Sequence, residues 1–152
     1  MYKFGKSSYK QLKTLHPDLQ LILLNVIEYY DFSILEGIRS EERQQELFEQ
    51  NRSKLDGVSK KSKHQGILLN NELVSMAVDI MPYKKGYNAF SGTEKDTRRF
   101  YFLMGMIRME SKRLLESGKI SHDVRFGIDW DSDDIYSDQS FDDAPHLELV
   151  TI

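Results

Sequence analysis

Val74-Ser75-Met76-Ala77-Val78-Asp79-Ile80, residues 74–80, is expected to form the central strand of the fold. Its length and its apolar, β-branched residues are typical of a buried strand, which Met81-Pro82 ends. A carboxylate among apolar neighbours is costly unless it is paired or bound to a metal ion. Asp79 is therefore expected to bind a metal, or else to pair with a buried arginine or a backbone amide.

Two histidines, one on each side of this strand along the chain, can complete a metal site with Asp79. His64 follows Ser62-Lys63, and His146 ends the segment Asp143-Ala144-Pro145-His146. Two imidazoles and one carboxylate can hold zinc and leave a fourth position open for water. A further carboxylate beside that water, for which Asp143 is a candidate, can act as a general base. The chain has no cysteine, so thiolate zinc sites are excluded, although a histidine taken alone is more often an ordinary residue.

Helical and strand-like segments alternate without the regular βαβ order of a parallel sheet. Short strands are predicted over 32–36, 124–126 and 146–150. The spacing of apolar residues and the positions of capping residues predict helices over about 17–30, 40–54 and 96–117. These elements indicate an α+β fold, a small antiparallel sheet with flanking helices.

The last strand is expected to divide its residues between two faces. Alternation puts His146, Glu148 and Val150 on one face and Leu147 and Leu149 on the other. Glu148 is thus either a hydrogen-bonding partner of the site or a solvated strand residue.

The composition predicts one globular domain over residues 1–152, with 39% hydrophobic and 30% charged residues. No apolar run is long enough to span a bilayer, and the start of the chain lacks the features of a secretory signal. The net charge is −3, with basic residues gathered near the start and over 52–63, and acidic ones over 129–143. We interpret the basic and acidic segments as solvated faces, or else the basic segments as a surface that binds a polyanion. The sequence contains no nucleic-acid-binding motif.

The order of several short motifs resembles that of a known family of peptidases. These motifs span nearly the whole chain: Phe4-Gly5-Lys6-Ser7-Ser8 with Leu12, Pro17-Asp18-Leu19-Gln20, Glu36-Gly37-Ile38-Arg39-Ser40, Ser62-Lys63-His64-Gln65, Ala77-Val78-Asp79-Ile80-Met81-Pro82-Tyr83, Arg125-Phe126-Gly127-Ile128-Asp129-Trp130-Asp131 and 143–150. On them the chain resembles the zinc D-Ala-D-Ala carboxypeptidase and L-alanyl-D-glutamate endopeptidase family, and within it the small phage endolysins. The resemblance implies the Hedgehog/DD-peptidase fold.

The resemblance implies a role for each of five residues. His64, Asp79 and His146 match the zinc ligands, and Asp143, rather than its neighbour Asp142, matches the catalytic carboxylate. Arg39 matches a position that holds a substrate carboxylate or carbonyl, although it can instead pair with Glu36 or Glu41 on the surface. One departure is that His64 and Asp79 are 79 − 64 = 15 positions apart, so the segment 66–74 is interpreted as an insertion, with Asn70-Asn71 at its tip.

The function that the resemblance implies is hydrolysis of the L-alanyl-D-glutamate bond of peptidoglycan stem peptides during host lysis. A monomer is expected, held in the host cytoplasm until it is released to the cell wall, with no nucleic-acid partner and no membrane insertion. The alternatives are a D-alanyl-D-alanine carboxypeptidase or dipeptidase, and a metal-bound cell-wall-binding module without catalysis. A muramidase is disfavoured because no pair of carboxylates suited to a sugar cleft stands out.

Asp129, Asp131 and Asp133 alternate as in the first half of a calcium-binding loop. The glycine expected next is replaced by Asp134, and no glutamate occupies the twelfth position, so the segment is not an EF-hand. It remains a candidate calcium or other cation site, with a solvated acidic loop as the alternative.

Overall fold

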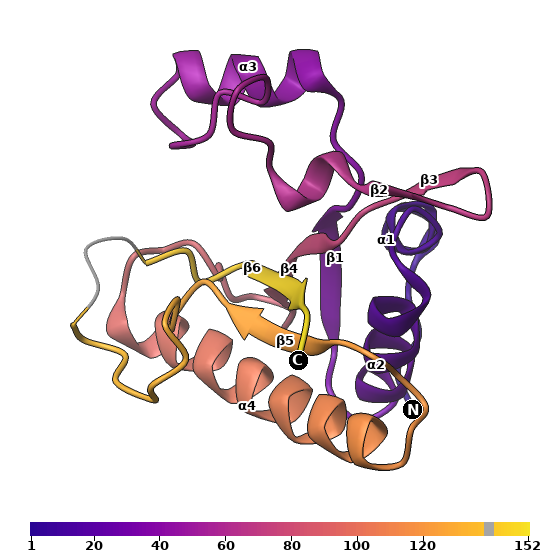
Figure 1. Cartoon of the computed structure of the whole chain (residues 1–152). Helices are drawn as coiled ribbons and strands as arrows, with labels where there is room; N and C mark the ends of the chain where they lie inside the picture. The colour runs from indigo at the N-terminus through magenta and orange to yellow at the C-terminus, as the bar shows by residue number, and fades with distance from the viewer. Residues whose placement is uncertain (139–141) are drawn as a thin grey trace.

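The computed structural model describes residues 1–138 and 142–152, and its centre is an antiparallel sheet (Figure 1). The strand order is β1-β4-β6-β5, so the two strands that carry Asp79 and His146 are neighbours in the middle. All three strand pairs are antiparallel. The strands are β1 (Phe32–Glu36), β4 (Ala77–Pro82), β5 (Asp123–Phe126) and β6 (His146–Val150).

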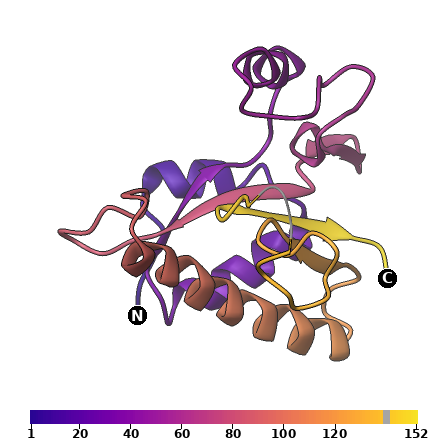
Figure 2. The same ribbon diagram turned by 90° about the vertical axis from the view of Figure 1, so that its left-hand side faces the viewer.

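Helices lie on both sides of this sheet (Figure 2). α2 and α4 pack against each other, α4 also contacts β4 and β5, and the apolar residues of both helices share one core with Val78, Leu147 and Leu149. α3 and the short 3-10 helix η1 lie on the opposite side, above the face that carries Asp79 and His146. The helices are α1 (Lys6–Leu12), α2 (Pro17–Ile27), α3 (Glu41–Glu49), η1 (Lys63–Gln65) and α4 (Glu94–Glu116).

The α+β prediction is confirmed, with differences at the ends of elements. The strand predicted over 74–80 pairs as β4 from Ala77, and it continues to Pro82, which faces Phe32 at the end of the ladder. A proline is tolerated there because the last residue of a strand loses little from its missing N–H. The helices predicted to end near residues 30 and 54 end at Ile27 and Glu49. Of the acidic segment 129–143, residues 139–141 lie outside the described part.

The segment 66–74 forms a separate two-stranded hairpin. β2 (Ile67–Leu69) pairs with β3 (Glu72–Val74). Asn70 and Asn71 form its tip with φ values of 49° and 66°, the left-handed conformation that tight hairpin turns require. The predicted turn is therefore confirmed, and the hairpin stays outside the main sheet.

The start of α2 is fixed by a cluster of polar side chains that the sequence did not suggest. The His16 ring nitrogen Nδ1 accepts a hydrogen bond from the Asp18 N–H at 3.1 Å, which caps the helix. Asp18 Oδ2 accepts from Ser121 N at 2.9 Å and lies 2.8 Å from His122 Nδ1. His122 is half-buried and joins the loop before β5 to α2.

Candidate active site

The pairing of β4 with β6 brings the first two predicted site residues together. Asp79 and His146 are directly opposite each other in this pair, and Asp79 Oδ1 lies 3.1 Å from His146 Nδ1. Both side chains leave the sheet on the face away from α4, because Leu147 and Val78 occupy the core face. The fold itself therefore places a carboxylate beside an imidazole.

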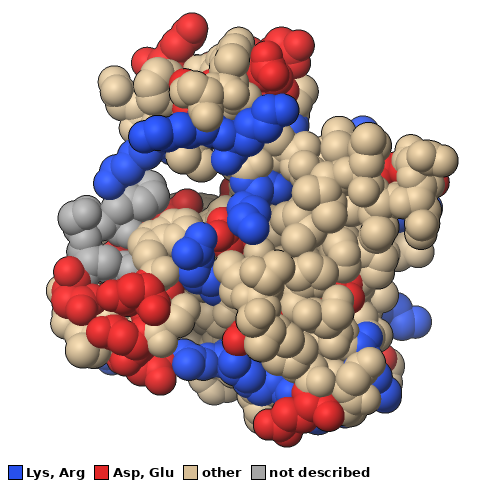
Figure 3. Space-filling view, in the orientation of Figure 1, with Lys and Arg blue, Asp and Glu red and all other residues tan. Residues whose placement is uncertain are grey.

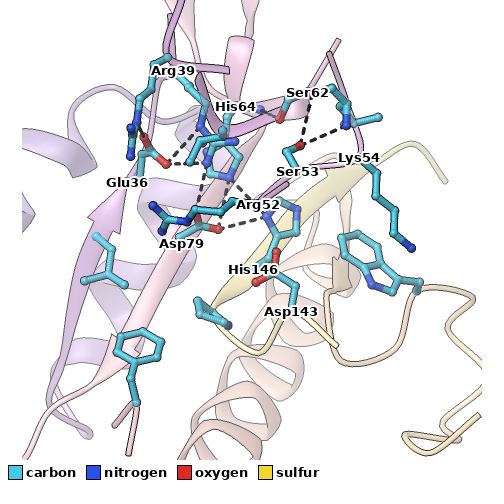
Figure 4. Close-up of a pocket in the computed structure, with 17 residues that line it drawn as sticks. Glu36, Arg39, Arg52, Ser53, Lys54, Ser62, His64, Asp79, Asp143 and His146 are labelled. Atoms are coloured by element: carbon cyan, nitrogen blue, oxygen red, sulfur yellow. Dashed lines mark hydrogen bonds and ion pairs between the residues drawn. The ribbon is translucent and has the colours of Figure 1, made fainter. Parts of the chain in front are cut away.

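His64 lies on η1, and its side chain points toward Asp79 and His146 at the edge of the cavity that all three residues line (Figure 4). A capping box holds η1: Ser62 accepts from the backbone of the helix, and the Gln65 side chain accepts from Ser62 N at 2.9 Å. His64 Nε2 lies 3.3 Å from Asp79 Oδ1 and 3.3 Å from His146 Nδ1. His64 Nδ1 donates to the Gly37 carbonyl at 2.8 Å, which leaves the lone pair of Nε2 facing the other two residues.

The three facing atoms form a nearly equilateral triangle that fits a tetrahedral metal ion. A metal held at 2.0–2.1 Å by nitrogen and oxygen ligands has ligand atoms about 3.3 Å apart at the corners of the tetrahedron. The observed separations are 3.1, 3.3 and 3.3 Å. The donor set of two imidazole nitrogens and one carboxylate oxygen, with a fourth corner open to the cavity, therefore suits a metal ion.

Glu148 holds the second imidazole from behind. Its Oε2 lies 3.0 Å from His146 Nε2, and its Oε1 accepts from Arg125 Nε at 3.1 Å. Glu148 is 5% exposed, so the interpretation as a solvated strand residue is wrong. A carboxylate bound to the outer nitrogen of a histidine fixes the ring and makes its inner nitrogen a better ligand.

The charges of the site are strongly coupled. Burial alone would raise the pKa of Asp79, but His64 and His146 outweigh burial and hold that pKa well below its usual range. Burial would likewise lower the pKa of His146, yet hydrogen bonds with Asp79 and Glu148 raise it to about 9. Burial opposes ionisation of Glu148 too, and the bonds from His146 and Arg125 bring its pKa to about 2. The site is thus organised around buried carboxylates that favour a cation.

Asp143 lines the same cavity, whereas Asp142 is exposed and does not. A tight turn places it: Asp143 N donates to the Gly127 carbonyl at 2.9 Å, and His146 N donates to the Asp143 carbonyl at 3.0 Å. Gly127 permits this approach, because a Cβ there would lie 2.2 Å from the Asp143 carbonyl oxygen. Burial raises the pKa of Asp143, and the nearby Asp79 carboxylate raises it further. A half-buried carboxylate with a raised pKa is suited to proton transfer.

The cavity has a volume of about 850 Å³, within the range of small-molecule and peptide-binding sites. Arg39 lines it with its side chain 9% exposed, and its guanidinium contacts Glu36 and, at 3.4 Å, Asp79 Oδ2. The expected pairing of Arg39 with Glu36 and its expected place in the cleft are therefore both observed.

Aromatic and basic side chains complete the walls, and sequence reasoning did not single them out. Trp130 packs on His146 with ring centroids 5.3 Å apart, and Phe90 also lines the cavity. Arg52 and Lys54 line it from the loop after α3. The presence of Trp130 in the Arg-Phe-Gly-Ile-Asp-Trp motif was a signal of its position near the site.

Asp129, Asp131 and Asp133 lie together outside this cavity, with one carboxylate oxygen of each within 4.8 Å of the others. Asp129 is 3% exposed, and its carboxylate accepts from Asp133 N at 3.1 Å and Asp134 N at 3.2 Å. Arg108 lies 3.9 Å from Asp129, so a cation already balances part of this charge. The three aspartates that alternate in the sequence therefore have their carboxylates close together in the structure.

This arrangement is typical of a mononuclear metallohydrolase: two sheet residues, Asp79 and His146, and His64 of η1 form a His-Asp-His donor set beside the half-buried Asp143. The family model described as phage L-alanyl-D-glutamate peptidase matches residues 1–150, so the chain belongs to that family. The resemblance found in the motifs is thereby confirmed.

Two known proteins are similar to this chain over almost its whole length. The L-alanyl-D-glutamate peptidase of Escherichia phage T5 is 31% identical over 154 residues, which cover 98% of each chain. The crystal structure of Serratia marcescens L-Ala D-Glu endopeptidase ChiX has the same fold, with a TM-score of 0.66 and 22% identity. That match covers 97% of this chain and 90% of ChiX. Among residues 1–138 and 142–152, no helix is long and apolar enough to cross a membrane.

Proposed function

We propose that this protein is a zinc-dependent endopeptidase that hydrolyses the L-alanyl-D-glutamate bond of peptidoglycan stem peptides. The observation that carries the proposal is the triangle of His64 Nε2, Asp79 Oδ1 and His146 Nδ1, with separations of 3.1–3.3 Å beside Asp143. The choice of bond rests on the family and on the activity named for the phage T5 relative.

In this proposal His64, Asp79 and His146 hold the zinc ion. Zinc, when bound there, supplies a Lewis acid that lowers the pKa of water to about 7 and polarises the scissile carbonyl. Asp143 takes a proton from the attacking water and returns it to the amine that leaves. Arg39 orients an anionic part of the stem peptide through its planar guanidinium, which Glu36 holds in place.

The proposed setting is lysis of a host cell. A protein of this kind accumulates in the host cytoplasm as a monomer and acts on the peptidoglycan after the membrane has been breached. The membership in a family of phage peptidases supports this setting.

The experiment that tests the proposed function is mass spectrometry of fragments released from purified peptidoglycan, with and without a chelator. The expected result is new N-terminal D-glutamate that disappears with chelator and returns when zinc is added. Release of terminal D-alanine alone would assign the protein as a carboxypeptidase instead. A zinc-loaded protein that binds peptidoglycan and releases nothing would be a binding module.

The acidic group of Asp129, Asp131 and Asp133 is proposed as a calcium site that orders the loop before Asp143. Supporting this, the carboxylate oxygens converge within 4.8 Å. Activity titrated with calcium should rise in the native protein and respond less in an Asp131→Ala, Asp133→Ala variant. An unchanged calcium response in that variant would exclude the site.

We propose further that residues 1–152 form one peptidase domain and that the hairpin of residues 66–74 is an insertion in it. Ile67 faces Val74 at the base of the hairpin, so residues 68–73 can be replaced by Asn-Gly, a tight two-residue turn. The free energy of unfolding should change by less than about 1 kcal/mol, since loop length has a small effect on closure entropy. Loss of bound zinc in this variant would show that the hairpin is part of the site.

A further inference from the structure

We propose that Arg52 and Lys54 form a second anion subsite, which receives a carboxylate of the stem peptide other than the one held by Arg39. This inference rests on the proposed function, and it names what the site recognises beyond the scissile bond. Both residues line the cavity that contains His64, Asp79 and His146.

The basic residues of the cavity lie on one wall. Figure 3 shows Lys and Arg side chains along the side of α3 and its following loop that faces the hollow above the sheet. Those that line the cavity are Arg39, Arg43, Arg52 and Lys54. A peptide with several carboxylates therefore meets a positive surface along the whole of this wall.

The four cations differ in how their charge is already used. Arg39 and Arg43 both contact Glu36, and Arg43 also lies 3.1 Å from Glu46. Within residues 1–138 and 142–152, no carboxylate lies within ion-pairing distance of Arg52. The guanidinium of Arg52 therefore brings uncompensated charge to the cavity, next to Lys54 on the same loop.

The loop that carries Arg52 is held in a fixed place. Arg52 N donates to the Leu47 carbonyl at 2.8 Å, which closes the end of α3, and Asn51 takes a left-handed φ of 57°. Gln44 is fully buried, and its side-chain nitrogen donates to Ser53 Oγ at 2.8 Å and to the Leu55 carbonyl at 2.7 Å. The backbone positions of Arg52 and Lys54 are thus set before substrate arrives.

Gln44 also connects this loop to Arg39. The Arg39 Nη1 atom donates to Gln44 Oε1 at 2.7 Å, while the other end of the same amide holds residues 53 and 55. One buried side chain therefore fixes the spacing between Arg39 and the Arg52 loop. Two cationic positions at a fixed separation are a means of recognising two carboxylates at once.

The stem peptide offers such carboxylates. D-Glutamate is linked onward through its γ-carboxyl, so its α-carboxylate is free unless it is amidated. Diaminopimelate at the third position carries a further free carboxylate, which lysine at that position lacks. The ligand of the Arg52 and Lys54 subsite is one of these two groups, and synthetic peptides distinguish them.

The test compares four peptides in which D-glutamate is free or α-amidated and the third residue is diaminopimelate or lysine. The native protein should have a kcat/KM about tenfold higher for the peptide that keeps the recognised carboxylate. In an Arg52→Gln, Lys54→Gln variant, this ratio should fall to about one. Lys60→Gln, Lys61→Gln removes the same charge outside the cavity and should keep the native ratio.

Calorimetric binding of uncut products provides a second measurement that does not depend on turnover. D-Glutamyl-γ-diaminopimelate and its amidated and lysine analogues are titrated into the zinc-loaded native protein and both variants. An unchanged preference in the Arg52→Gln, Lys54→Gln variant, or an equal loss for all peptides, would overturn the subsite. If the native protein cuts none of the peptides, the proposed function fails, while the titration still decides whether these residues bind a carboxylate.

Discussion

Asp79 and His146 are directly opposite residues of β4 and β6, and Asp79 Oδ1 lies 3.1 Å from His146 Nδ1. A slip of one residue between these strands would turn one of the two side chains into the core and Leu147 or Val78 out of it. The register of an apolar pair of strands therefore guarantees the geometry of the site. The strand register that buries Val78 and Leu147 in the core is thus the same register that places the metal donors of Asp79 and His146 side by side.

Replacing Asp143 by asparagine should separate catalysis from metal binding. Asparagine keeps the shape of the side chain but accepts no proton, so kcat should fall by about 10²–10⁴-fold. Zinc content should stay at the native level, since Asp143 is outside the donor triangle. Activity on peptidoglycan and metal analysis of the same sample measure both quantities.

The neighbouring Asp142→Asn variant serves as the control, because Asp142 is exposed and does not line the cavity. It should retain native activity. Equal losses in the two variants would assign the effect to the charge of the loop rather than to proton transfer by Asp143.

Glu148→Gln should weaken metal binding without removing a ligand. The amide loses the charge that supports His146 Nε2, where the Glu148 carboxylate lies 3.0 Å away. Loss of such an outer partner typically lowers metal affinity by about 10–100-fold. Competition with a chelating dye measures the change, and Glu72→Gln on the exposed hairpin is the matched control. Native affinity in Glu148→Gln would mean that the sheet alone orients the ring.

The sequence predicted the site better than its surroundings, for a physical reason. The strand over 146–150 and its two faces follow from alternation alone, and the structure has the same bounds. Asp79 stood out because a carboxylate in an apolar strand needs a partner. Alternation along a strand and a carboxylate among apolar neighbours are local features of the sequence, so they can be recognised before the fold is known.

Features that depend on distant contacts were missed. α1 has only Ser8 and Leu12 buried and no side-chain cap, so its pattern was too weak to predict a helix. α3 stops at Glu49 because Asn51 adopts a left-handed conformation, which its sequence permits without requiring. The contact of Trp130 with His146 joins distant segments, and only the motif that contains Trp130 hinted at it. The link from Gln44 to Arg39 has no local sequence signal.

Gly66→Ala should destabilise the protein strongly, because Gly66 joins η1 to the hairpin in a conformation with φ 74° and ψ −175°. A Cβ at this position would lie 2.3 Å from the Val74 carbonyl oxygen. The expected loss in the free energy of unfolding is about 3 kcal/mol or more, from strain and overlap together.

Gly86→Ala is the comparison for this prediction, since Gly86 has a φ of 84° but nothing within 4 Å of a Cβ. Only conformational strain remains there, which costs about 1–2 kcal/mol. Urea unfolding of both variants measures the difference. Losses of the same size would show that the hairpin moves to accept the methyl group.

His16 should make the protein less stable in mild acid. Burial lowers the pKa of His16 below its usual 6.5, and Asp18 opposes this only in part. Between the lowered folded pKa and 6.5, the unfolded chain binds more protons than the folded one, so unfolding is favoured as the pH falls. The contribution of neutral His16 to stability is therefore complete above pH 6.5 and is lost progressively below it.

A His16→Asn variant isolates this effect, because asparagine keeps a side-chain acceptor for the Asp18 N–H and does not titrate. Urea unfolding of zinc-loaded protein at pH 7.5 and 5.5 should show a larger loss of stability in the native protein than in the variant. Titrating groups that do not interact with His16 contribute equally to both proteins, so their contributions cancel in the comparison. Parallel losses would contradict the prediction and would mean that the cluster of His16, Asp18 and His122 opens to admit the proton without cost to the fold.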